Sequence, residues 1–258
     1  MGRLVWAAWL LVLAGHGYAA AADGPSAPIA TDRPAVTDSS VVVPVGSLVA
    51  ENGITDSVNG GKRIIDATET LLRLGVGTKT EVRLTVPDYF GAASGPSGFG
   101  DPLIGMKQQL GPAPGGFDVS VILSLSLPTG AKAISSHGYD ASLQLPWSHA
   151  VSSNWTAEGM LSVYSPTQAG RHNVTGETTF LMDRQLTKTW DAFVEYAGDF
   201  PERGGPRHLL HIGTALKTAP AQQVDLHFGV GLSSAAADHF IGFGYSFRLQ
   251  AFHHRGQP

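Results

Sequence analysis

The sequence predicts an all-β protein, specifically an antiparallel transmembrane β-barrel of about twelve strands. Apolar and polar residues alternate over long stretches, as in FDVSVILSLSLPTG (residues 117–130). A period of two places the apolar side chains on one face of a strand, whereas a helix would spread them around its circumference. The 32 glycines and 16 prolines, without strong helical periodicity, indicate many turns. The alternating stretches run for about ten residues, the length that a tilted transmembrane strand needs.

The N-terminal residues divide into two expected segments. Residues 1–22 have the pattern of a secretory signal peptide, with Arg3 ahead of an apolar run and a small-residue cleavage site at the end. The apolar run is too short to span a bilayer, which leaves a retained membrane anchor as the weaker alternative. Residues 23–39 are rich in Pro, Ser and Thr and are predicted to form an extended periplasmic tail. Whether this tail blocks the mouth of the barrel stays open.

Alternation continues through residues 40–249, the predicted barrel, and a polar tail follows at residues 250–258. The expected strands are residues 40–52, 65–76, 79–89, 101–110, 116–127, 138–149, 153–164, 172–185, 189–199, 206–217, 222–232 and 239–249. Short links follow the even-numbered strands, and longer loops follow the odd ones, beginning with NGITDSVNGGKR. This sorting of the loops, with both termini on the short-turn side, is typical of outer-membrane barrels.

The two faces of the expected strands differ in charge. One face is apolar, as at Leu143, Leu145 and Trp147 of a single strand. The other face carries the candidate pore-lining residues, which are Arg73, Glu81, Arg83, Lys107, Glu158, Glu177, Asp191, Glu195, His227 and Arg248. In a dry core, each imperfectly paired charge would cost several kcal/mol, whereas a barrel lumen supplies water and counter-charges. We therefore expect the apolar face to meet lipid. A secreted sandwich or a lipocalin-like barrel with its polar face in bulk water is the alternative.

Several functions find no support in the composition and motifs. A net charge of -4 and a pI near 6.2 provide no basic patch for nucleic acid. There is no G-x-S-x-G, H-E-x-x-H or P-loop motif, and His208 and His211 fall on opposite faces of a strand, so we expect no catalytic residue, metal or cofactor. A phospholipase-like enzyme remains the enzymatic alternative, with His137 beside Ser135 and Ser136 in a loop that lacks an orienting amide.

Four stretches of the chain carry a family resemblance: TDRP (31–34), ETLLRLGVGTKTEVRL (69–84), GFGDPLIGMKQQL (98–110) and LSLPTG (125–130). They resemble the outer-membrane transporter-like family named for the meta-pathway of phenol degradation. The resemblance implies a Gram-negative outer-membrane barrel that passes small compounds, aromatic or hydrophobic ones among them. It brings no catalytic residue and no particular substrate. The last strand is also similar to the aromatic carboxy-terminal pattern that barrel-assembly machinery recognises, which makes this machinery an expected partner during biogenesis.

The expected function is passive passage of small molecules through the outer membrane, with membrane lipid and a solute as partners and no enzymatic activity. Selection would follow from the width of the lumen and from a mixed-sign ring of Arg73, Arg83, Lys107, Glu158, Glu177, Asp191 and Glu195. A structural barrel without transport stays open as the alternative. Eight strands make a filled barrel and sixteen leave an aqueous channel, and twelve lies between these two.

Overall fold

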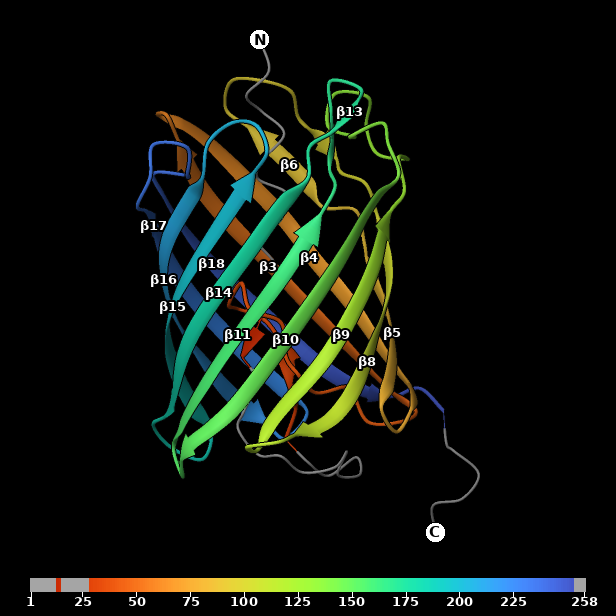
Figure 1. Ribbon diagram of the computed structural model, residues 1–258, viewed down its shortest axis with the longest axis vertical. Helices are drawn as coiled ribbons and strands as arrows, with labels where there is room; N and C mark the ends of the chain where they lie inside the picture. Colours follow the sequence, from red (N-terminus) through yellow and green to blue (C-terminus); the bar gives the residue numbers. More distant parts are fainter. Residues whose placement is uncertain (1–12, 15–27, 253–258) are drawn as a thin grey trace.

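The computed structural model describes residues 13–14 and 28–252 and forms a closed antiparallel β-barrel (Figure 1). Twelve strands make the wall. In the order around the barrel they are β3 (Ser47–Asn59), β18 (His239–Gln250), β17 (Gln222–Gly231), β16 (Arg207–Ala219), β15 (Trp190–Pro201), β14 (Thr175–Gln185), β11 (Trp155–Tyr164), β10 (Asp140–Ser152), β9 (Phe117–Ser126), β8 (Leu103–Ala113), β5 (Thr80–Thr85) and β4 (Lys62–Gly77). The pairing of β3 with β4, the first two of these strands along the chain, closes the wall. The predicted fold is confirmed.

Six short strands complete the described structure. β6 (Tyr89–Ala92) pairs with β4, and β7 (Gly98–Phe99) pairs with β6. β12 (Thr167–Gln168) and β13 (Arg171–His172) form a small hairpin at the long-loop end, and β1 (Leu13–Ala14) pairs with β2 (Thr31–Asp32). None of the described residues belongs to a helix that is long and apolar enough to cross a membrane.

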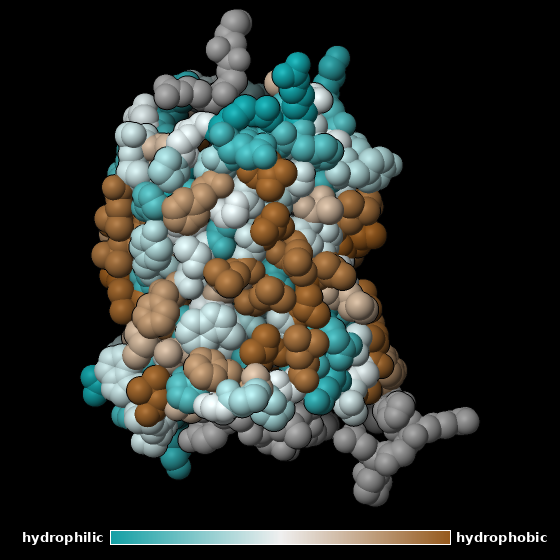
Figure 2. All heavy atoms as spheres, in the orientation of Figure 1, coloured by the Kyte–Doolittle hydropathy of each residue, from teal (hydrophilic) through white to brown (hydrophobic). Residues whose placement is uncertain are grey.

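An apolar belt surrounds the wall at mid-height. On the face shown in Figure 2, hydrophobic side chains gather across the middle of the barrel, and hydrophilic ones cover both ends. Leu123, Leu161, Leu226 and Phe243 are each at least half exposed, which would be costly in water and is suited to lipid. The strands therefore turn their apolar face outward, as the alternation predicts.

Two expected boundaries are wrong at the start of the barrel. The first strand begins at Ser47, not at residue 40, and residues 40–46 lie inside the barrel. The first long loop is instead a tight turn, because β3 and β4 continue to pair as far as Asn59 and Lys62. Gly60 and Gly61 both have positive φ (56° and 73°), the conformation that a two-residue hairpin turn requires.

The third expected strand is also interrupted. β5 pairs with β8 only as far as Thr85 and Leu103, and the chain then turns so that β6 pairs with β4. Pro87 follows this break, and proline has no N–H with which to continue the ladder. The upper wall between β4 and β8 is therefore built partly by loops.

Two expected segments lie mostly outside the described residues. Of the signal peptide predicted at residues 1–22, only residues 13–14 are described, and of the polar tail predicted at residues 250–258, residues 250–252 are described. The predicted cleavage site falls on undescribed residues.

Residues 28–43, here called the lumen segment, run through the barrel interior. The sequence predicts an extended periplasmic tail over residues 23–39, but the described part of it is enclosed by the wall, and Figure 1 shows it in red behind β10 and β11. Thr31, Asp32 and Arg33 are at most 1% exposed. The segment occupies the half of the lumen nearer the short turns, where the N–H of Ile29 donates to the carbonyl of Pro220 (2.8 Å). The segment shows no alternation of apolar and polar residues because the wall surrounds it on all sides.

Leu123 and Ser124 of β9 test which face meets lipid. Leu123 is 53% exposed in the apolar belt, whereas Ser124 lines an interior cavity. Leu123→Arg should destabilise the barrel by about 2–4 kcal/mol and impair its assembly, while Ser124→Arg should be far milder. Urea titrations of both variants in lipid vesicles measure the difference. Equal losses at the two positions would contradict the assignment.

Candidate functional site

Inward-facing carboxylates of the wall hold the backbone of the lumen segment. This backbone makes few ladder hydrogen bonds of its own, yet buried N–H groups need acceptors. Three glutamates supply them at 2.7–2.8 Å: Glu51 accepts from the N–H groups of Asp32 and Arg33, Glu195 from those of Val36 and Thr37, and Glu81 from that of Val43. The wall therefore carries acceptors placed for this segment, which distinguishes the segment from a loosely inserted tail.

Asp32 lies at the centre of a buried cluster of charges. Its carboxylate pairs with Arg73 (2.8 Å), Lys107 (3.1 Å) and Arg83. Glu81 joins the same cations, at 2.9 Å from Arg73 and 3.0 Å from Arg83. These side chains are at most 8% exposed, so each charge depends on its neighbours rather than on water.

Arg33 anchors the same part of the segment to β4 and β17. Its guanidinium pairs with Glu69 of β4 and, at 3.2 Å, with Asp225 of β17. Asp32 and Arg33 are adjacent in sequence, and together they connect the segment to β4, β5, β8 and β17. The segment is thus held by ion pairs to which it contributes an acidic residue, Asp32, and a basic residue, Arg33.

The structure places all ten candidate pore-lining residues on the interior side of the wall, in separate groups. Arg73, Glu81, Arg83 and Lys107 come together around Asp32. The others are distributed along the lumen, where Glu195 connects to His227 through His211 (2.8 and 3.0 Å), Asp191 pairs with Lys217 (3.6 Å), Glu177 accepts from Ser162 (3.1 Å), and Glu158 and Arg248 are buried to 1% and 8% exposure.

Sequence reasoning missed the partners that the lumen segment brings. Asp32 and Arg33 lie in the expected tail, and Glu51 and Glu69 lie in the expected strands 40–52 and 65–76 but are not among the candidate pore-lining residues. One signal could have found the first two residues, since Asp32 and Arg33 are adjacent opposite charges that precede a barrel with many inward-facing charges. Strand alternation cannot find them, because the segment has no alternating face.

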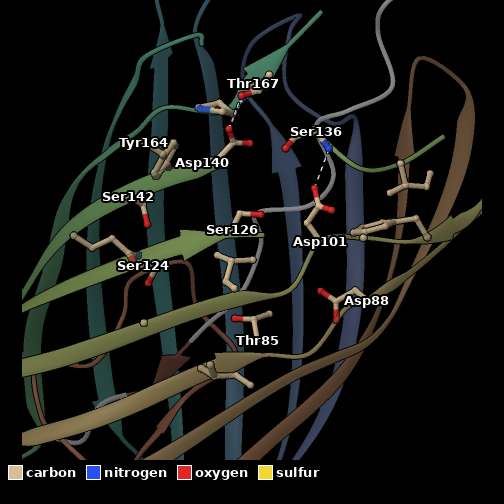
Figure 3. A pocket seen from close by; sticks show the side chains of 18 of the residues that line it. Thr85, Asp88, Asp101, Ser124, Ser126, Ser136, Asp140, Ser142, Tyr164 and Thr167 are labelled. Carbon is tan, nitrogen blue, oxygen red and sulfur yellow. Dashed lines mark hydrogen bonds between the residues drawn. The ribbon is translucent and has the colours of Figure 1, made fainter. Parts of the chain in front are cut away.

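A cavity of about 160 Å³ lies above the lumen segment, toward the long-loop end. Val36 and Asp38 of the segment form part of its floor, and β4, β5, β8, β9, β10, β11 and β14 form its wall. Figure 3 shows Thr85, Ser124 and Ser142 around this space, and Asp101 and Asp140 close to the loops. The lumen thus has an open upper chamber above a filled lower half.

Most carboxylates of the cavity already serve the fold. Asp101 accepts from the N–H groups of Gly130 and Ser136 and from the hydroxyl of Ser135 (2.8–3.0 Å). Asp140 accepts from the N–H and hydroxyl of Thr167 (2.9 and 2.6 Å). These bonds tie the long loops to the tops of the strands, so the chamber is a preformed space.

Asp88, in the link between β5 and β6, differs from these carboxylates. It is 7% exposed, and no described residue bonds its Oδ1 atom. Burial raises the pKa of Asp88 to about 7, and repulsion from Glu69 adds to the increase. A carboxyl in such a position gains most from a donor that enters the cavity.

The described residues contain no group of three or more His, Asp or Glu side chains that could hold a metal ion. The residues considered for phospholipase chemistry make loop contacts instead. His137 Nε2 lies 3.0 Å from the carbonyl of Lys132, and the Ser135 hydroxyl donates to Asp101. These contacts hold the loop and leave the imidazole and the hydroxyl engaged with other groups.

Comparison with known proteins gives a family and a fold. Residues 31–249 match the family described as "Putative MetA-pathway of phenol degradation". No curated protein matches the chain. Three similar solved structures are the COG4313 outer membrane channel from Pseudomonas putida F1 (9% identity, TM-score 0.61, 81% of this chain and 97% of that one), the NanC porin (6%, 0.57, 78% and 100%) and the KdgM porin (11%, 0.53, 80% and 99%). At these identities the likeness concerns the fold alone.

Asp32→Ala tests whether the ion pairs hold the lumen segment. The change leaves Arg73, Arg83 and Lys107 with too little counter-charge in a buried site, a loss that costs about 3–5 kcal/mol in such pairs. The N–H groups of residues 36, 37 and 43 should then exchange with solvent at least 100-fold faster in hydrogen-exchange measurements, while those of the wall strands stay protected.

Asp56→Ala is the matched control, because Asp56 pairs with Arg63 at an exposed site where an ion pair contributes little. Unchanged exchange of the segment in Asp32→Ala would show that its charges do not hold it.

Proposed function

We propose that this chain, which belongs to the family described as "Putative MetA-pathway of phenol degradation", is an outer-membrane channel or transporter for passive uptake or efflux of small compounds, aromatic or hydrophobic ones among them. The observation that carries the proposal is the division of the lumen into an open chamber and a separate filling segment. The lumen segment contributes no strand to the closed wall. It can therefore leave the lower lumen without breaking the hydrogen bonds that close the barrel.

The proposed route begins in the cavity at the long-loop end and continues through the space that the lumen segment occupies. In the closed state Arg73, Glu81, Arg83 and Lys107 bind the segment. When the segment shifts, the same side chains line the passage together with the six other candidates, and water replaces the lost partners. These inward-facing charges of both signs thus have two roles, holding the segment and selecting the solute.

The same proposal covers export and assembly. The N-terminal residues direct export as a cleaved signal peptide, and the barrel-assembly machinery inserts the strands. Support comes from the apolar core after Arg3 and from the aromatic side chains of β18, where Phe243 and Tyr245 face outward. We propose no enzymatic activity, since the serine and histidine side chains considered above serve loop contacts.

A structural barrel without transport is the second candidate. The burial of Arg73 and Lys107 at 0% exposure favours it, because a filled lower lumen resembles the interior of a closed barrel. The two candidates differ in one property: a channel conducts when the segment is displaced or removed, whereas a structural barrel needs the segment for its fold.

Planar-bilayer conductance tests the proposal. The intact protein should show low conductance with brief openings, and a variant lacking residues 28–43 should conduct several-fold more, because the lower lumen is then open to water. Arg73→Gln combined with Arg83→Gln should move the intact protein in the same direction.

Circular dichroism checks that each variant keeps its β-structure. A folded deletion variant that does not conduct would contradict the channel and favour the structural barrel.

A further inference from the structure

Two described side chains of the cavity above the lumen segment have a buried polar atom without a hydrogen-bond partner, Asp88 and Gln168, and Asp88 carries the charge. Asp88 lines the cavity, is almost fully buried, and has an Oδ1 atom without a hydrogen-bond partner among the described residues. Figure 3 shows its carboxylate beside Thr85, turned toward the open space. A buried carboxylate oxygen without a donor loses a large part of its hydration, and a ligand that donates to it restores what is lost.

The charges around the cavity favour a positive ligand. Its lining includes five carboxyl side chains, those of Asp38, Asp88, Asp101, Asp140 and Glu177. Among the described residues of the lining, the single basic side chain is that of Arg83, and its guanidinium already pairs with Asp32, Asp38 and Glu81. No basic group of the lining is left for an anion, and the low-dielectric walls strengthen the field of the carboxylates.

Apolar side chains and size define the rest of the ligand. Leu71, Phe90, Leu103 and Met160 line the same cavity as Asp88. Its volume, about 160 Å³, is close to that of an apolar cavity of about 150 Å³ that is known to bind benzene. The space therefore suits an apolar group of about one ring.

We propose that this cavity binds small organic ammonium ions, with the ammonium group at Asp88 and an apolar group of one ring against Phe90 and its apolar neighbours. Small organic ammonium ions would then be the substrate class of the channel, and this part of the assignment rests on the proposed function. An ammonium gains a charge-assisted hydrogen bond, which is stronger than the bond that a neutral hydroxyl makes. A carboxylate ligand of the same size meets repulsion instead.

Isothermal titration of the purified full-length barrel in detergent tests the assignment. Three ligands of similar size serve as probes: benzylammonium, benzyl alcohol and benzoate. At pH 8 Asp88 is ionised, because its pKa is about 7, and the amine is still protonated. Benzylammonium should bind best, benzyl alcohol more weakly, and benzoate not measurably.

Asp88→Asn should weaken benzylammonium binding by about 10- to 100-fold, the range for a hydrogen bond to a charged group, and should change benzyl alcohol binding far less. The control Asp56→Asn removes a carboxylate of the exposed Asp56–Arg63 pair, outside the cavity lining, and should change neither affinity. Ile134→Trp, a loop substitution in the cavity lining, should weaken both ligands together and provides a second test if Asp88→Asn does not fold.

Benzoate binding as tight as that of benzylammonium, or equal affinities for benzylammonium and benzyl alcohol in the unaltered protein, would overturn the assignment. The result is separable from the channel proposal. Conductance without benzylammonium binding overturns the ligand class alone, and binding without conductance supports the site while it contradicts the channel.

Discussion

The pairing of Asp32 with Arg73, Arg83 and Lys107 is the interaction on which the interior of this barrel depends. Three cations within one lumen would repel one another and would each lose hydration, unless a carboxylate lies between them. Glu81 of the wall supplies one such carboxylate, and Asp32 of the lumen segment supplies a second, at 2.8 Å from Arg73 and 3.1 Å from Lys107. The wall alone is a ring of strands with charges facing inward. The lumen is divided into a filled lower half and an open upper chamber because the lumen segment pairs with these charges.

The lumen segment in turn depends on the wall for its own backbone. Paired strands satisfy their N–H groups by ladder bonds, but this segment receives carboxylate acceptors from Glu51, Glu81 and Glu195. The dependence is mutual: Asp32 of the segment pairs with cations of the wall, and carboxylates of the wall accept hydrogen bonds from the backbone of the segment. Its consequence is spatial: the lower lumen is filled, and the upper lumen keeps a chamber with acidic and apolar walls. A segment held by such contacts can be released by disrupting them, while the closed wall keeps its ladder.

The wall could be predicted from sequence because its rule is local. Lipid contact on one side gives a period of two, and this placed strands such as β9 and β15 within two residues and put the charged side chains of Arg73 and Glu195 inward. The rule failed where the chain has no lipid contact. The sequence predicts a strand from residue 40 and a tail over residues 23–39, although residues 40–46 and the described part of this tail lie inside the barrel. The partners of Asp32 are 41 to 75 positions away (residues 73, 83 and 107), and no local pattern records such pairing. The cavity likewise depends on how the loops fold over the strand ends.

A disulfide between the lumen segment and the wall tests most directly the claim that this segment closes the lower lumen. The Ser40 and Ser148 hydroxyl oxygens lie 2.7 Å apart, and the chain contains no cysteine, so Ser40→Cys with Ser148→Cys gives a single defined pair. Single-channel recording before and after reduction is the measurement. The disulfide should form under oxidising conditions and suppress openings, and reduction should restore them. Two cysteines that stay unpaired, or a formed disulfide that leaves the openings unchanged, would contradict this account of the lumen.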